Sequence, residues 1–356
     1  MSKSRSNQET KFATGCFYRT FGRMIMYNSG MKAFAGAAIL LTIWAVSGCT
    51  AQVPKGTPLV TEVRHEPWDT GYAGGTKYST EHYRIFSTTN NRPLLEAMPA
   101  FMEASYARYL ALTSLPEDKS IGPMQIYLMG TRAEWAVLTR NVIPGDVQTV
   151  LSIQAGGFCY NKTCLFWDIG VTGTLSVAAH EGLHQFFAHR LKHHLPLWLE
   201  EGLCVTAEGY DIDRDMVVFT PQRNITRFSG LRETIMTGRW IPLSKLIKMD
   251  SGDALNAGGT NAQALGYYAQ LWSLVLYIRS VPAYRAGLEQ LLADAAAGRF
   301  HEVLKAPPKA YGQLQLREKV YNQAVSEPIF RHYISNDPVA FERGYRQFAK
   351  KLAMIE

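Results

Sequence analysis

The sequence lacks the features that mark repeat proteins, disordered chains and nucleic-acid-binding proteins. It contains no internal repeat, and its 356 residues are 19% charged and 47% hydrophobic, which is the composition of a globular protein rather than of a disordered chain. The formal net charge of +7 is unevenly placed, because residues 1–48 hold six lysines and arginines against one acid. The remaining chain is nearly neutral, so there is no electrostatic case for binding nucleic acid.

The apolar run near the N-terminus is too short to span a membrane comfortably. It extends from Ala33 to Val46, follows a lysine and precedes small residues, as in a secretory signal. It ends in the stretch VSGC, closed by Cys49, which resembles the lipobox of bacterial lipoproteins. In such proteins the cysteine is lipidated and becomes the mature N-terminus. The resemblance therefore implies a signal peptide over residues 1–48 and a lipid on Cys49.

The same resemblance places the chain in the bacterial cell envelope. The lipid would tether it to a membrane, and Thr50 in place of an aspartate favours the outer membrane, facing the periplasm or the cell surface. A start at Met24 or Met31 would shorten the long leader. A buried N-terminal helix is the alternative, although a core helix should alternate with polar residues and this stretch does not.

The rest of the sequence divides into three parts by composition and periodicity. Residues 49–79 are rich in proline, glycine and threonine and predict a lipidated tether. Residues 80–212 alternate strand and helix patterns and predict a small mixed sheet packed on helices. Residues 213–356 are mostly helical in pattern, so the predicted fold class is α+β with a mostly helical C-terminal subdomain. The elements expected are strands over 82–88 and 124–130, and helices over 94–112, 131–140 (capped by Thr131), 174–193 and 196–208.

Two cysteines flank a polar turn in the segment GGFCYNKTCLFW. Apolar and aromatic residues outside the turn predict a hairpin whose arms carry Cys159 and Cys164. In an oxidising compartment a disulfide would join them, and a reduced pair is the alternative. Two cysteines alone are too few for a structural zinc knuckle.

The stretch AAHEGLHQFF contains two histidines four positions apart with a glutamate next to the first. On a helix such positions lie on one face, about 6 Å apart along the axis, so His180 and His184 can direct both imidazoles at one ion. Glu181 is too close in sequence to share the ion comfortably but can reach a water bound to it. The pattern predicts a zinc site that needs one more protein ligand.

Two adjacent glutamates compete for the third ligand position. If a helix begins near Pro196, Glu201 shares an apolar stripe with Cys204, and a carboxylate buried there without a partner would cost several kcal/mol. Glu200 projects about a quarter turn away and is expected to be solvated. We therefore expect Glu201 to bind the metal.

HEGLH at 180–184 and WLEEGL at 198–203, with sixteen residues between His184 and Glu201, together resemble the gluzincin metallopeptidases. In particular they resemble the peptidase-MA-like domains of bacterial lipoproteins. The resemblance implies a thermolysin-like fold, Zn²⁺ held by His180, His184 and Glu201, and Glu181 as the catalytic base. Cys204 departs from the alanine usual in such proteins. It fills space in the core, or it occupies the open coordination position and abolishes catalysis.

Three further polar residues have two interpretations each. Glu208 orients a ligand imidazole, or it caps a helix at the surface. Asp168 orients His184, or it caps the helix that follows it. Tyr268 lies in the segment YYAQLW, which resembles the segment after the active-site helices of gluzincins, so it is either an oxyanion donor or part of the core. The histidines 189, 193 and 194 are expected at a solvated basic helix end.

The strand before the first site helix is expected to bind substrate, as the edge strand does in gluzincins. Gly156 and Gly157 would let a peptide backbone approach and pair by β-addition, or they form only a bulge. A zinc-activated water would then hydrolyse a peptide bond, with Glu181 passing a proton to the leaving amine. The predicted partners are a peptide or protein substrate and, through the lipid, a membrane.

Two other classes of function stay open. A non-catalytic envelope protein would hold a structural zinc, with Cys204 or a histidine as its fourth ligand. An interaction module would keep the fold without metal. The presence of Glu181 favours the peptidase, because a structural site has no use for a base.

Overall fold

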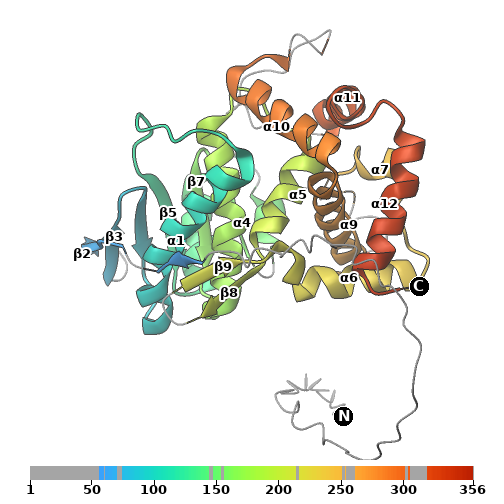
Figure 1. Cartoon of the computed structure of the whole chain (residues 1–356). Coiled ribbons are helices and arrows are strands. Elements are labelled where there is room, and N and C mark those ends of the chain that lie inside the picture. The colour runs from blue at the N-terminus through green and yellow to red at the C-terminus, as the bar shows by residue number, and fades with distance from the viewer. Residues whose placement is uncertain are drawn as a thin grey trace, which may run out of the picture. The chain divides into compact units, whose positions relative to one another are not determined.

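The computed structural model describes residues 56–59, 61–69, 74–143, 147–153, 156–213, 216–250, 253, 261–300, 304 and 319–355. These residues belong to one compact unit of the chain, Gln52–Glu356. The expected signal peptide and Cys49 lie outside the described residues. Strands and helices combine in a mixed α+β fold, as predicted (Figure 1). In this part of the chain no helix has both the length and the apolar character needed to cross a bilayer.

Six strands form a mixed sheet in the order β2-β3-β4-β5-β7-β6. The strands β4, β5 and β7 are parallel, and β2, β3 and β6 pair antiparallel to their neighbours. The expected strands over 82–88 and 124–130 are confirmed as β4 and β5. The strands comprise β2 (Arg64–Asp69), β3 (Gly74–Ser79), β4 (Tyr83–Ser87), β5 (Met124–Met129), β6 (Gly157–Tyr160) and β7 (Thr163–Trp167).

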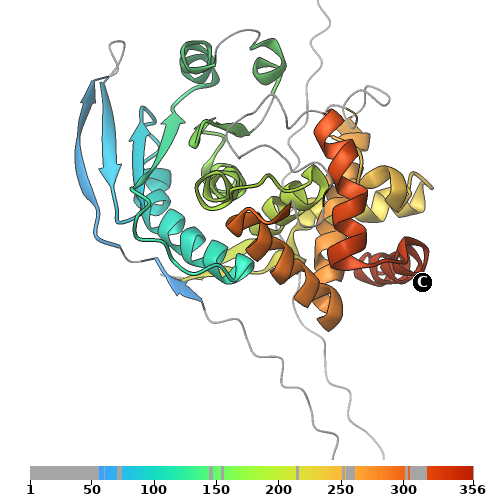
Figure 2. The ribbon, with the colours of Figure 1, turned by 90° about the horizontal axis from the view of Figure 1, so that it is seen from above.

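The expected tether over residues 49–79 is wrong for its described part. The strands β2 and β3 extend the sheet at the end opposite β6, and Figure 2 shows them in blue. Trp68 of β2 packs on Phe86 and Tyr127 with ring centroids 5.3 and 5.8 Å apart. Gly75, opposite Trp68 in the register, leaves room for the indole, because a Cβ there would lie 2.8 Å from it. Composition hid these strands because glycine and proline are uncommon in strands, whereas the pairing of β2 with β3 and of β3 with β4 stabilises them.

The predicted hairpin around the two cysteines is confirmed as β6 and β7, and β6 is an edge strand. Asn161 and Lys162 have φ of 47° and 67°, the left-handed conformation of a two-residue hairpin turn. Cys159 lies directly opposite Cys164 in the register. Both are free thiols, so the expected disulfide is not formed. The Cys164 thiol is buried, which raises its pKa well above the usual range, and it donates instead to the carbonyl oxygen of Glu181.

Helices cover both faces of the sheet. Ile126 and Leu128 of β5 face the helices α1 (Arg92–Thr113) and α4 (Val171–Arg190), in the main core. The alternate residue Met129 faces α2 (Arg132–Val142), whose Trp135 is fully buried. The predicted cap of α2 is confirmed, since Thr131 and Glu134 form a reciprocal capping box. The short helix α3 (Gln148–Leu151) connects α2 to β6.

The C-terminal half is mostly helical, as predicted, but its expected boundary at residue 213 falls at the end of a strand. The strands β8 (Tyr210–Asp213) and β9 (Met216–Phe219) pair, and β1 (Thr57–Pro58) joins β9. At the centre lies α9 (Asn261–Ser280), which packs against α5, α6, α10 and α12. The other helices are α5 (Leu197–Ala207), α6 (Ile225–Met236), α7 (Leu243–Leu246), α10 (Pro282–Ala297), α11 (Lys319–Ile329) and α12 (Pro338–Leu352).

Candidate metal centre

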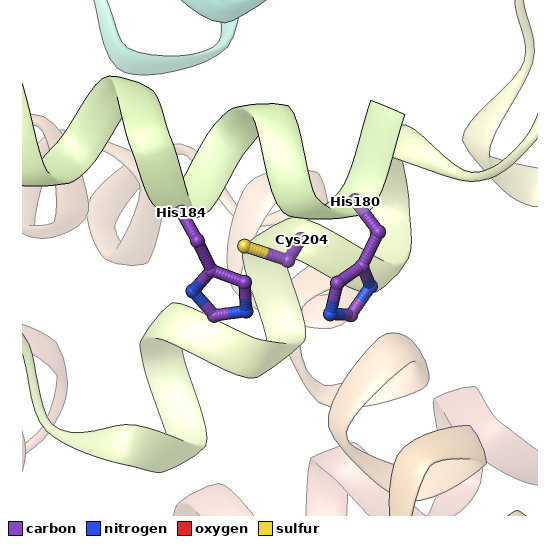
Figure 3. Close-up of side chains that lie close together, drawn as sticks. All are labelled: His180, His184 and Cys204. Atoms are coloured by element: carbon purple, nitrogen blue, oxygen red, sulfur yellow. The ribbon is translucent and has the colours of Figure 1, made fainter. Parts of the chain in front are cut away.

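The helices α4 and α5 pack against each other and carry the residues of the centre. His180 and His184 lie one turn apart on α4, with 14% and 11% of their side-chain surface exposed. Figure 3 shows both rings on one side of this helix, with a ring nitrogen of each turned toward the other ring. Leu183, Phe186 and Phe187 of the same helix are fully buried in the core. The helix is therefore fixed with both imidazoles in one small space.

Both motif glycines permit close helix packing. At Gly182, between the two histidines, an added Cβ would lie 2.6 Å from the hydroxyl oxygen of Tyr109. That hydroxyl donates to the carbonyl oxygen of Ala179 and ties α1 to α4. At Gly202 in α5 an added Cβ would lie 2.6 Å from a methyl carbon of Val275 in α9. The glycines thus set the distances between the helices that position the site.

Glu201 of α5 faces both histidines of α4. Its Oε2 lies 3.5 Å from His180 Nε2 and 3.7 Å from His184 Nε2. Ligand atoms of a tetrahedral zinc, bound at about 2.0–2.1 Å, lie roughly 3.3 Å apart, so both distances from Glu201 are near the spacing that zinc requires. The structure therefore brings together the three residues that the sequence assigned to the metal.

The other nitrogen of each imidazole contacts a further carboxylate. His180 Nδ1 lies 2.9 Å from Glu208 Oε1, and His184 Nδ1 lies 2.8 Å from Glu200 Oε1. Carboxylates in this position fix the ring orientation and the tautomer of metal-binding histidines. The contact expected between Glu208 and a site imidazole is present.

The expectation that Glu200 is solvated is wrong. Its side chain is fully buried. The reason is that α5 is covered on more than one side, by α4 and by α9, so a residue off the apolar stripe is also enclosed. The contact with His184 Nδ1 offsets the cost of burying this carboxylate. The sequence could have predicted the burial of Glu200 only on the assumption that the second nitrogen of each histidine contacts an acid.

Glu208 is anchored by a second helix. Arg227 in the first turn of α6 donates to both of its oxygens, at 2.8 and 3.0 Å, and Asn224 donates to Oε2 at 3.0 Å. Burial alone would raise the pKa of Glu208. The positive charge of Arg227 and the hydrogen bond with His180 outweigh burial and lower this pKa to about 2. Arg227, which the sequence did not single out, thereby holds the orienting carboxylate ionised.

Apart from the imidazoles, the centre carries more negative than positive charge. Glu200, Glu201 and Glu208 surround the two imidazoles, and Arg227 supplies the only arginine charge paired with them among the described residues. Burial would lower the pKa of His180, but hydrogen bonds with Glu201 and Glu208 raise it to about 9. The carboxylates thus favour positive charge at this point. Two imidazole nitrogens and a carboxylate oxygen are also a donor set suited to zinc.

Cys204 lies one turn beyond Glu201 on α5. Its Sγ and one nitrogen from each of His180 and His184 all lie within 4.8 Å of one another. Burial raises the pKa of this thiol to about 12, although nearby His184 acts in the opposite direction. The pKa of Glu201 is instead held well below its usual range: burial opposes this, and the hydrogen bonds with both histidines outweigh it. Without a bound metal, Glu201 is therefore ionised at neutral pH and Cys204 is a neutral thiol, although a metal ion held by the histidines would favour ionisation of that thiol as well.

Glu181 is half-buried on α4, beside His180. Its negative charge is among the causes that raise the pKa of His180, which places the carboxylate near that ring. The backbone of the same residue accepts the Cys164 thiol, so β7 fixes this turn of α4. Glu181 is therefore held on the same turn of α4 as His180.

Tyr268 lies on α9 next to the network around Glu208. The guanidinium of Arg227 sits 5.3 Å from the centroid of its ring, and Tyr267 packs on it at 5.2 Å. Tyr267 itself is fully buried and donates to the carbonyl oxygen of Met249. Of the two tyrosines, only Tyr268 has a partly exposed side chain. Tyr268 is thus placed beside the centre through Arg227.

Asp168 does not contact His184, so the first of its two expected roles is wrong. Its carboxylate accepts hydrogen bonds from the backbone of Gly170, from Thr89 and from Asn91. It therefore fastens the loop before α4 to the segment between β4 and α1. Glu200, and not Asp168, contacts and orients the His184 imidazole.

Gly156 and Gly157 have conformational and packing roles of their own. Gly156 has φ of 129°, which side chains rarely adopt. A Cβ at Gly157 would lie 2.5 Å from that of Phe166 in β7, so the hairpin strands could not approach as they do. The structure accounts for both glycines without a substrate.

The histidines after α4 are not a solvated group. His194 is 3% exposed, and His193 accepts a hydrogen bond from the backbone of Phe300. Burial lowers the pKa of His189 to about 4. The expected solvated helix end is therefore wrong, because helices far along the chain cover it.

Comparisons with known proteins add no relative. No family model matches the chain, and no match was found among curated proteins or solved structures. The case for a function therefore rests on the geometry of the centre.

Proposed function

We propose that the protein is a zinc-dependent peptidase of the gluzincin type. One observation carries this proposal: Nε2 of His180 and Nε2 of His184 both face a single oxygen of Glu201, at 3.5 and 3.7 Å. The Nδ1 atoms are at the same time held by two further carboxylates, an arrangement that metal-binding histidines commonly have. Packing alone gives no reason to gather three carboxylates around two imidazoles.

His180, His184 and Glu201 would hold the zinc. When bound, zinc would polarise a peptide carbonyl and lower the pKa of a water to about 7. Glu181, on the same turn as His180, would accept a proton from the attacking water and pass it to the leaving amine. Glu200 and Glu208 keep the imidazoles in the orientation needed. Tyr268 is the candidate donor to the carbonyl oxygen of the substrate, at the partly exposed side of α9.

The substrate class follows from the edge of the sheet. The strand β6 is an edge strand and packs beside α4, which carries the site. An extended peptide can add to such an edge through backbone hydrogen bonds, with its side chains on alternate faces. A peptide or protein substrate fits this edge better than a compact small molecule does.

The decisive experiment separates metal binding from catalysis. Glu181→Gln should retain one zinc per chain, while hydrolysis of a peptide library by the purified protein falls by at least about a hundredfold, as when a general base is lost. His180→Ala and His184→Ala should lose zinc and hydrolysis together. Glu233→Gln, at an exposed ion pair with Arg239, is the matched control and should change neither. Wild-type protein that binds no zinc would refute the proposal.

A structural zinc site is the second candidate, because Cys204 Sγ lies within 4.8 Å of both site histidines. Cobalt substitution distinguishes the two: a sulfur-to-cobalt charge-transfer band that disappears in Cys204→Ala would show a closed site with a thiolate ligand. The peptidase predicts no such band, and Cys204→Ala should keep its activity. Protein without stoichiometric metal would point instead to an interaction module.

We also propose that the peptidase is anchored by lipid on Cys49 in the bacterial envelope. The support is the VSGC motif after an apolar segment. Cys49→Ser should leave an unlipidated precursor, visible as a mass difference on mass spectrometry. Wild-type protein recovered without lipid from the cytosol would contradict this location.

A further inference from the structure

A second cavity lies apart from the metal centre and shares no residue with it. Its volume is about 480 Å³, and it is lined by α1, α5, α9 and α12 together with residues 219–222. The walls are mainly apolar, with Phe219, Leu276, Phe348 and Leu352 among them. Small-molecule sites have this size and this character, with a few polar groups that fix the orientation of the ligand.

The charged groups of this cavity are two arginines from different helices, and Thr206, Gln222 and Ser280 add uncharged polar groups. Arg108 comes from α1 and Arg279 from α9, and no aspartate or glutamate is among the residues that line the cavity. The Nε of Arg108 is buried and has no hydrogen-bond partner among the described residues. Arg279 donates one N–H to the carbonyl oxygen of Leu112, at 3.0 Å. Two guanidinium groups thus border a space that no acid lines, and the nearest acidic influence on Arg279 is the charge of Glu289 on α10.

The charges of these arginines disfavour each other. Burial and, as the smaller cause, the positive charge of Arg279 together lower the pKa of Arg108 to about 10. Arginine is rarely buried without a carboxylate or phosphate partner, because an unpaired donor there costs free energy. An anion between the two groups would remove both penalties.

We propose that this cavity binds a small aliphatic carboxylate, of the chemical class of a medium-chain fatty acid. The planar guanidinium matches the two oxygens of a carboxylate, which the terminal N–H groups of Arg108 and the remaining N–H groups of Arg279 can satisfy. The apolar walls take the aliphatic chain. An anion without a tail leaves these walls in water, and an uncharged chain leaves the arginines without a partner.

Titration calorimetry with the full-length protein and octanoate tests the proposal. Octanoate is expected to bind one per chain. Octanol, butyrate and octyltrimethylammonium should each bind at least about tenfold more weakly, because each lacks the charge, the chain or the correct sign. Octanol that binds as tightly as octanoate would overturn the role of the arginines. Octyl phosphate that binds more tightly than octanoate would overturn the carboxylate in favour of a phosphate head.

Variants assign the binding to this cavity. Arg108→Gln should weaken octanoate binding by about tenfold or more, while Arg343→Gln, which removes an exposed charge on α12 outside the cavity, should leave it unchanged. Leu352→Trp keeps both arginines but fills the apolar space, so it should also weaken binding. Equal affinity in Arg108→Gln, Leu352→Trp and wild type would place the octanoate elsewhere and refute the proposal.

A measurement without ligand guards against a variant that only unfolds. Arg108→Gln removes a buried charge that has no acidic partner in the cavity, so its melting temperature should equal or exceed that of the wild type. Octanoate should raise the melting temperature of wild type and of Arg343→Gln but not that of Arg108→Gln. A melting temperature well below wild type without ligand would contradict the unpaired state of Arg108.

Discussion

His184 Nδ1 lies 2.8 Å from Glu200 Oε1, inside a helix pair that excludes water from that carboxylate. Glu200 is adjacent in sequence to Glu201, yet the two residues contact opposite nitrogens of the same ring. Glu200 therefore fixes the orientation of the imidazole through Nδ1, and Glu201 faces the Nε2 atom on the other side of the ring. Both acids of the pair act on His184, by different atoms.

Substitution of Glu200 tests this division of roles. Glu200→Gln should lower zinc affinity by about 10–100-fold, because the orienting charge on His184 is lost, and Glu201→Gln should lower it further. Competition with a chromogenic chelator measures both. Glu233→Gln is again the surface control. A Glu200→Gln variant that holds zinc as tightly as this control would show that Glu200 only fills space.

The ion pair between Arg227 and Glu208 should contribute to stability as well as to the site. The two side chains are only 15% and 10% exposed, so Arg227→Met leaves a buried carboxylate with one partner fewer and should destabilise by about 3 kcal/mol. Urea unfolding measures this loss. Arg331→Met removes an exposed pair with Glu327 and should cost at most about 1 kcal/mol. Equal losses in the two variants would mean that the Glu208 pair behaves as a surface pair.

The close approach of α1 to α4 predicts unequal effects for two glycines of one helix. Gly182→Ala must displace Tyr109 and should destabilise by about 1–3 kcal/mol. Gly173→Ala meets only flexible side-chain atoms of Ile169 and should be neutral or stabilising by up to about 1 kcal/mol, since alanine favours the helix. Thermal unfolding of both variants decides. If Gly182→Ala has wild-type stability, α1 can shift away from α4 at little cost in free energy.

His82 should make the stability depend on pH. Its Nδ1 lies 2.6 Å from Glu103 Oε2, and its ring stacks on Tyr106. Burial lowers the pKa of His82, but the hydrogen bonds and charges of Glu103, Glu117 and Glu81 outweigh burial and raise it. Because the pKa of His82 is higher in the folded than in the unfolded protein, protonated His82 stabilises the folded state. This contribution is fully present below the unfolded pKa of about 6.5 and is lost as pH rises through the folded-state pKa.

The comparison of wild type with His82→Gln measures that contribution. The difference in free energy of unfolding between them should be largest near pH 5 and shrink toward pH 8. Glu103→Gln should abolish most of this trend, because its charge and hydrogen bond raise the pKa. A difference that stays constant from pH 5 to pH 8 would exclude a charged His82–Glu103 pair.

Local patterns identified most of the elements near the centre. The helices α1, α2, α4 and α5 and the strands β4 and β5 follow from apolar periodicity and capping residues, which act over a few residues. The hairpin β6–β7 follows from a polar turn between apolar arms. The strands β2 and β3 did not follow, because each is stabilised by its pairing across the sheet rather than by its own composition.

The sequence by itself determined which residues meet at the centre wherever helical spacing decides. His180 and His184 are four positions apart, and a helical stripe turns Glu201 rather than Glu200 toward their Nε2 atoms. Tertiary structure alone decided what lies behind them: Glu200 and Glu208 on the Nδ1 atoms, Arg227 from α6 on Glu208, and Asp168 on a loop instead of a histidine. The physical reason is that burial of α5 and the approach of α6 depend on helices packed from distant parts of the chain, which no local period records.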